Sequence, residues 1–140
     1  MDINNLEVYK KLKEYLNFFE FFKEAINNAK EPMILTTPEL EKPGPVIVFA
    51  NEEMCKRTGY SFEELVGQTP RVLQGDKTNP EIILQLKKEL IEQKVFSCET
   101  INYKKDKTPY KVRIVVCPLY DSKGQLINYV GIHQILEEMN

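Results

Sequence analysis

The stretch VFSCETINYKKDKTPYKVRIVVCPLYDSKGQLINYVGIHQIL, residues 95–136, decides the fold. It contains three runs rich in β-branched and aromatic residues, and two polar turns, KKDKT and DSKG, separate them. Runs of this kind joined by short turns indicate strands that pair with their chain neighbours as antiparallel hairpins. The last third of the chain is therefore predicted to form a three-stranded antiparallel meander.

Two more strands are predicted upstream of this meander. PMILTT (residues 32–37) and VIVFAN (residues 46–51) are short apolar runs, and a turn rich in Pro and Gly, PELEKPGP, lies between them. The second run is continuously apolar and β-branched, which predicts a buried strand.

Capping signals indicate three helices between the strands. Asn51 is a suitable N-cap for a short helix over EEMCKRT, and Ser61 with Glu64 forms a capping box for the next one. Asn79 followed by Pro80 begins a longer helix that continues to about residue 93. The predicted fold class is therefore α+β, with a five-stranded antiparallel sheet and short helices on one face.

The N-terminal region is predicted to be one long amphipathic helix over residues 4–30. Its apolar residues recur three or four positions apart, and Glu31-Pro32 ends the pattern. Additional phenylalanines widen the apolar face, so this helix needs a partner, either the sheet or a second subunit. We therefore divide the chain into a helical extension and candidate dimerisation element (1–30), one folded domain (31–136) and the start of a C-terminal connector (137–140).

Composition excludes several classes of function. The net charge of −2 gives no electrostatic footprint for nucleic acid, and no run of 18 apolar residues is present to cross a membrane. The mixed, charged N-terminus does not read as a signal peptide, so a cytoplasmic protein is expected. With one histidine, three cysteines and no CxxC motif, neither a metal site nor a catalytic triad is predicted, and we expect a non-enzymatic domain.

Two segments carry a resemblance to a known family. They are VIVFANEEMCKRTGYSFEELVGQTPRVLQG and INYKKDKTPYKVRIVVCPLYDSKGQLINYVGIHQI, within residues 31–135. In combination they resemble the PAS domain, and within it the LOV branch of flavin-binding blue-light sensors. The resemblance implies a sensory and regulatory module that binds a small molecule, either a flavin nucleotide such as FMN or another ligand.

One position departs from the LOV pattern in a way that changes the chemistry. LOV domains carry a cysteine in the loop that corresponds to GQTPRVLQG, and light bonds its sulfur to the flavin ring. Pro70 stands at that position here. Proline has no nucleophile, so the resemblance predicts a LOV-like domain that does not form the cysteinyl adduct.

The resemblance also implies which residues meet the flavin phosphate and ribityl chain. Arg71 and Gln74 match residues that contact these groups, and Lys87 occupies a position where some LOV domains carry a second phosphate-binding arginine. Thr69 replaces an asparagine that contacts the ribityl chain. Without a ligand, Arg71 would instead be a surface residue that pairs with a nearby carboxylate.

The positions that would meet the flavin ring differ more from the LOV pattern. Asn102 matches an asparagine that bonds the polar edge of the flavin ring, whereas Val112 replaces the second such asparagine. His133 replaces the glutamine that responds to light in LOV signalling. An unpaired group at a buried ring edge costs roughly 1–3 kcal/mol, so the loss at Val112 weakens the case for flavin. Asn102 could otherwise be a strand-end residue that bonds the adjacent turn.

Two other functions stay open at this point. In the first, the domain binds no ligand and serves dimerisation or protein interaction, with its pocket filled by Phe49, Val72, Val112 and Ile132. In the second, His133 ligates a haem iron in a redox or gas sensor. For the sensory function the resemblance implies a homodimer through the N-terminal helix and the sheet, and an effector of kinase or cyclase type if the chain is part of a longer protein.

Overall fold

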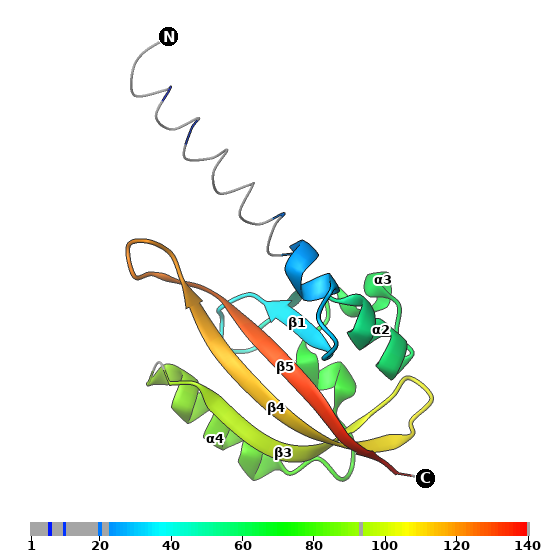
Figure 1. Ribbon diagram of the computed structural model, residues 1–140. Coiled ribbons are helices and arrows are strands. Elements are labelled where there is room, and N and C mark those ends of the chain that lie inside the picture. The colour runs from blue at the N-terminus through cyan, green and yellow to red at the C-terminus, as the bar shows by residue number, and fades with distance from the viewer. Residues whose placement is uncertain (1–5, 7–9, 11–19, 21–22, 93, 140) are drawn as a thin grey trace.

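The structure, a computed structural model, describes residues 6, 10, 20, 23–92 and 94–139. Its centre is one antiparallel sheet in the order β2-β1-β5-β4-β3 (Figure 1). The strands are β1 (Met33–Thr36), β2 (Ile47–Ala50), β3 (Phe96–Tyr103), β4 (Pro109–Tyr120) and β5 (Leu126–Glu138). Strands β3, β4 and β5 pair with their neighbours as hairpins, so the predicted meander is confirmed.

Four helical elements of the described residues lie between β2 and β3 in the chain. They are α2 (Glu52–Thr58), α3 (Phe62–Leu65), the 3-10 helix η1 (Pro70–Leu73) and α4 (Pro80–Ile91). The predicted caps are present: Asn51 accepts a hydrogen bond from the Met54 backbone, and Ser61 and Glu64 form a capping box. Helix α4 begins at the predicted residue and ends at Ile91, two residues before the expected end.

Strand β2 is less buried than the sequence indicates. It forms one edge of the sheet, and among the strands of the described residues it pairs with β1 alone. The side chain of Val48, at its centre, is 38% exposed. The prediction of a fully buried strand is therefore wrong at this residue, because a continuous apolar run does not reveal which strand lies at an edge.

Each face of the sheet has its own core. On the face that carries α2, α3 and η1, a buried cluster joins Ile34 and Ile47 to residues of these helices. On the opposite face, Ile26 packs with Leu35, Phe49 and Val130. Residues 23–27 are helical, whereas most of the predicted helix over residues 4–30 lies outside the described residues.

Asn51 connects three parts of the fold and is fully buried. Its amide nitrogen donates to the carbonyls of Ile26 (2.7 Å) and Glu31 (2.9 Å). Its Oδ1 accepts from the backbone nitrogens of Met33 and Met54, both at 2.9 Å. One side chain thereby fixes the end of the N-terminal helical segment against both β1 and α2.

Among the residues that the structure describes, no helix combines the length and the apolar character needed to cross a bilayer.

Candidate ligand-binding cavity

A cavity of about 370 Å³ lies between the sheet and the elements η1, α4 and the β1–β2 loop. This volume falls in the range of small-molecule sites, which run from roughly 300 to 1,000 Å³. Most of its wall is apolar and is formed by Ile34, Leu40, Ile82, Ile83, Leu86, Leu90, Phe96, Ile114, Val116 and Tyr129.

The structure places all six residues that the resemblance implies as cofactor contacts in the wall of this one cavity. They come from four separate segments of the chain: the loop and helix η1, α4, β3 and β5. Pro70, which occupies the position of the LOV cysteine, lies in the same wall. The six residues are Thr69, Arg71, Gln74, Lys87, Asn102 and His133.

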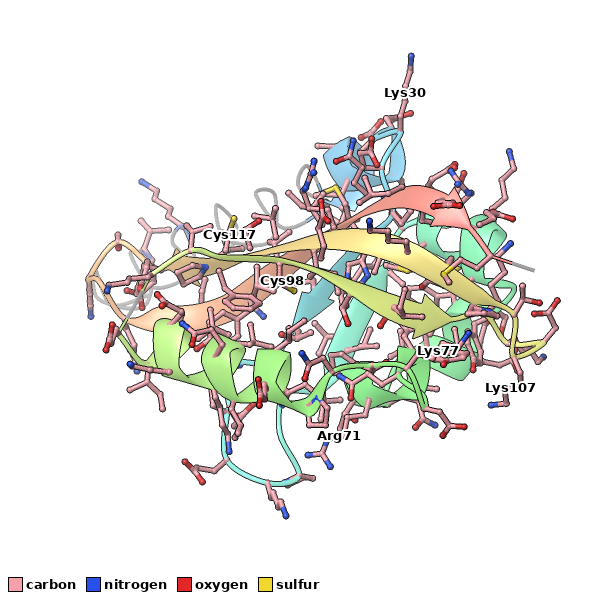
Figure 2. The ribbon with its side chains drawn as sticks, turned by 90° about the horizontal axis from the view of Figure 1, so that it is seen from below. Lys30, Arg71, Lys77, Cys98, Lys107 and Cys117 are labelled. Atoms are coloured by element: carbon pink, nitrogen blue, oxygen red, sulfur yellow. The ribbon has the colours of Figure 1, made fainter. Side chains whose placement is uncertain are left out.

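Three cations contribute to the cavity wall. They are Arg71, Lys87 and Lys42 of the β1–β2 loop. Arg71 is exposed (Figure 2). Its Nη2 donates to the Pro43 carbonyl at 3.1 Å. No carboxylate of the described residues lies within ion-pair distance of these three cations. The interpretation of Arg71 as the partner of a nearby carboxylate is therefore wrong for the described part of the chain.

The segment after η1 is fixed tightly against β3. The Thr78 hydroxyl donates to the Ile101 carbonyl at 2.6 Å and accepts from the Gly75 backbone at 3.1 Å. The Lys77 backbone donates to the Tyr103 hydroxyl at 2.8 Å. A Cβ at position 75 would lie 2.5 Å from the Tyr103 ring, so only glycine fits. These contacts hold the short helix η1 in place at the cavity wall.

Asn102 also lines the cavity and is 3% exposed. Its register partner on β4 is Tyr110. Burial raises the pKa of Tyr110 to about 12, and the hydrogen bond from the Asn102 side chain opposes this rise. Asn102 therefore bonds across the β3–β4 ladder, and the interpretation that it bonds the adjacent turn finds no contact among the described residues to support it.

His133 is held in the middle of the sheet and is 4% exposed. Its backbone nitrogen donates to the Pro32 carbonyl at 2.8 Å, and its Nδ1 finds no hydrogen-bond partner among the described residues. Burial lowers the pKa of the imidazole from 6.5 to about 4. The ring is therefore neutral at neutral pH, with one nitrogen that donates and one that accepts.

The residues expected to fill the pocket lie elsewhere. None of Phe49, Val72, Val112 and Ile132 lines the cavity. Phe49 and Ile132 pack on the opposite face of the sheet, and Val72 packs against the core near α2. The prediction that these four side chains fill the pocket is wrong. Ile132 directly precedes the cavity residue His133 and so points to the other face, and Phe49 pairs with Leu35 and packs with it on that face.

Sequence reasoning missed several residues of the wall. Cys98, Thr100 and Asn102 are every second residue of β3, so they share one face of the sheet. This two-residue period could have identified Cys98 and Thr100 from the sequence. Lys42 and Gly44 lie in the β1–β2 loop, where no local pattern shows that the loop returns to the cavity. Thr78 gave no signal of its own, because it sits in an irregular segment.

Cys98 in the cavity wall and Cys55 near it are both protonated at neutral pH. Burial raises the pKa of Cys98, and burial together with Glu63 and Glu52 raises that of Cys55. Cys98 lies on the side of the sheet that faces α4, whereas Cys117 lies on the opposite side (Figure 2). At neutral pH Cys55 and Cys98 are therefore protonated thiols rather than nucleophilic thiolates.

This arrangement, a five-stranded antiparallel sheet with short helices and a cavity on one face, is that of the PAS fold. A sequence profile described as "PAS domain" matches residues 17–134. The chain therefore belongs to the PAS domain family.

Relatives and solved structures place it beside the LOV domains. A blue-light-activated histidine kinase of Brucella ovis is 34% identical over 110 residues, which are 79% of this chain and 22% of the kinase. Protein TWIN LOV 1 of Arabidopsis thaliana is 31% identical over 113 residues, 80% of this chain and 28% of that protein. The chain thus spans about a quarter of the length of these relatives.

Two solved structures match closely in shape. One comes from work on the light-oxygen-voltage domain mechanism with a flavin analogue; it has a TM-score of 0.74, 27% identity and coverage of 82% of this chain and 84% of that one. The other is the light-state LOV structure of the photoreceptor Aureochrome1, with a TM-score of 0.69, 29% identity and coverage of 82% and 88%. The chain is a PAS domain similar to the LOV branch.

Proposed function

We propose that this chain is a sensory PAS domain that binds a flavin nucleotide in the cavity and signals without forming a cysteinyl adduct. One observation carries the proposal: all six residues implied by the LOV resemblance converge on a single cavity that the chain's own side chains leave open. The role is binding and signalling, and no residue is assigned a catalytic function.

The cations of the cavity wall suit the phosphate of FMN. A phosphate monoester carries nearly two negative charges at neutral pH. Arg71, Lys87 and Lys42 line the cavity, and no carboxylate of the described residues neutralises them. The Arg71 guanidinium is suited to bind phosphate through two parallel hydrogen bonds. The apolar wall then accommodates the flavin ring.

Asn102 and His133 suit the polar edge of that ring. Asn102 offers both an amide donor and a carbonyl acceptor, and neutral His133 offers one of each. A ligand bonded to His133 would satisfy a nitrogen that otherwise has no partner among the described residues. Binding therefore offsets the cost of burying an unpaired imidazole nitrogen.

The hydrogen bonds of the sheet provide a route for the signal. His133 donates from its backbone to Pro32, which directly precedes β1 and follows the N-terminal helical segment. Asn51 in turn bonds the carbonyls of Ile26 and Glu31 at the end of that segment. A ligand that binds two arrangements of β5 with different affinity would thus shift the N-terminal segment. We place the dimer contact in residues 1–30 and the effector, of kinase or cyclase type, in a longer protein.

An equilibrium titration with FMN tests this function. Saturable quenching of flavin fluorescence is expected, and Asn102→Ala is expected to weaken it about tenfold, because a buried hydrogen-bonding side chain is lost. Gln134→Ala on the exposed side of β5 is the matched control and should bind as the wild type does. Absence of saturable binding by the folded wild type, or unchanged binding by Asn102→Ala, would contradict the proposal.

A further inference from the structure

Two buried polar atoms lack a hydrogen-bond partner among the side chains that the structure describes: the Thr100 hydroxyl oxygen and His133 Nδ1. Both residues line the cavity. Buried polar side-chain atoms are paired in the large majority of cases, so each exception calls for a cause. Because both atoms belong to residues that line one cavity, a polar group placed in that cavity is positioned to pair with them.

The position of Thr100 gives this observation a more specific meaning. In the register of β3 and β4, Thr100 lies directly opposite Val112. Val112 stands where LOV domains carry their second ring-edge asparagine, but it is fully buried and does not line the cavity. Thr100, directly across the β3–β4 ladder from Val112, does line the cavity, and its side chain carries a hydroxyl.

We propose that Thr100 supplies the ring-edge hydrogen bond that Val112 cannot make. Thr100 and Asn102 lie two residues apart on β3, so their side chains emerge on the same face about 6.6 Å apart along the strand. Thr100, Asn102 and His133 of β5 are thus three polar residues in the cavity wall. This inference rests on the proposed flavin function and deepens it, because it assigns a residue that the LOV pattern does not contain.

The chemistry of a hydroxyl also defines the ligand class. Threonine both donates and accepts, and rotation about its χ1 angle redirects the hydroxyl without moving the backbone. Thr100 can therefore bond a ring carbonyl or a ring N–H. The three polar groups together suit the edge of a planar heterocycle in which carbonyl acceptors flank an N–H donor, as in the flavin ring.

Two substitutions separate the hydroxyl from the shape of the side chain. Thr100→Val replaces the hydroxyl with a methyl group of similar volume, and Thr100→Ser keeps the hydroxyl. Ser97→Ala, an exposed residue on the opposite face of β3, is the matched control. Each variant is titrated with FMN and with riboflavin, and the flavin carbonyl stretch is recorded by infrared difference spectroscopy.

Thr100→Val is expected to weaken FMN and riboflavin equally, by about three- to tenfold, because the lost bond is to the ring that both ligands share. The carbonyl stretch should move to higher wavenumber. The same variant should raise the urea midpoint of the ligand-free protein, since it removes an unpaired buried hydroxyl. A threonine with a purely structural contact would instead lower that midpoint. Thr100→Ser and Ser97→Ala should bind like the wild type.

The titrations distinguish failure of the role of Thr100 from failure of the flavin function. If the wild type binds flavin and Thr100→Val leaves both affinities and the carbonyl stretch unchanged, the role of Thr100 is overturned while the flavin function stands. Equal losses in Thr100→Val and Thr100→Ser would attribute the effect to packing and would also overturn it. If the folded wild type binds neither FMN nor riboflavin, the flavin function fails, and this inference fails with it.

Discussion

Acidification is expected to destabilise the ligand-free domain through His133. Burial lowers the pKa of this imidazole to about 4 in the folded protein, against 6.5 as its ordinary value, and no charged neighbour contributes to the shift. Between these two values the unfolded chain binds a proton that the folded chain does not bind. The stability contributed by neutral His133 is therefore complete above pH 6.5 and is lost as the pH falls toward 4.

The size of this loss follows from the difference between the two pKa values. Each pKa unit corresponds to 1.36 kcal/mol, so the free energy of unfolding should fall by about 2 kcal/mol between pH 7 and pH 5, and by about 3 kcal/mol at pH 4. Since small domains are stable by only about 5–15 kcal/mol, this is a large fraction of the total.

Urea unfolding at pH 7.5 and pH 5 measures the effect, with His133→Gln as the matched variant. Glutamine does not titrate, so the variant retains every carboxylate that contributes to acid sensitivity and lacks only the imidazole. On acidification the wild type should lose about 2 kcal/mol more of its unfolding free energy than the variant loses. A difference that stays constant between the two pH values would refute the burial argument for His133.

Three further substitutions test other parts of the molecule. Pro70→Cys restores a thiol at the LOV position, so light is expected to convert bound flavin to the adduct spectrum in this variant and not in the wild type; an adduct in the wild type would mean that another cysteine reacts. Arg71→Gln should weaken FMN about tenfold and leave riboflavin unaffected, because a charged hydrogen bond to phosphate is lost; equal losses for both ligands in fluorescence titrations would contradict the phosphate role. Asn51→Asp keeps the oxygen that accepts from Met33 and Met54 but loses both donated bonds, so chemical denaturation should show a loss of about 2–4 kcal/mol; a change below about 0.5 kcal/mol would refute its connecting role.

Local signals predicted the fold well. The capping residues Asn51, Ser61 and Asn79 act within one helical turn, so their effect is visible in sequence, and the structure contains all three caps. The meander followed from short turns between alternating runs. The exposure of Val48 did not follow, because the position of a strand within the sheet order depends on pairings between distant segments.

Site residues could be predicted from the sequence only where they match the family pattern or share a strand face with a residue that does. Arg71 and Asn102 came from the resemblance, and the structure places both in the cavity wall. Thr100 shares the face of Asn102, but an unpaired hydroxyl becomes visible only when every neighbouring atom has been placed. Lys42 reaches the cavity through the return of the β1–β2 loop, a tertiary contact that no local pattern encodes.

The absorption spectrum of the purified chain, recorded after reconstitution with FMN and removal of free ligand, tests the central claim most directly. One oxidised flavin per chain is predicted, with vibrational structure in the visible band because the ring lies in an apolar cavity. A folded protein that retains no chromophore would contradict the flavin function and favour a ligand-free module. A Soret band in the protein as purified would assign the cavity and His133 to haem instead.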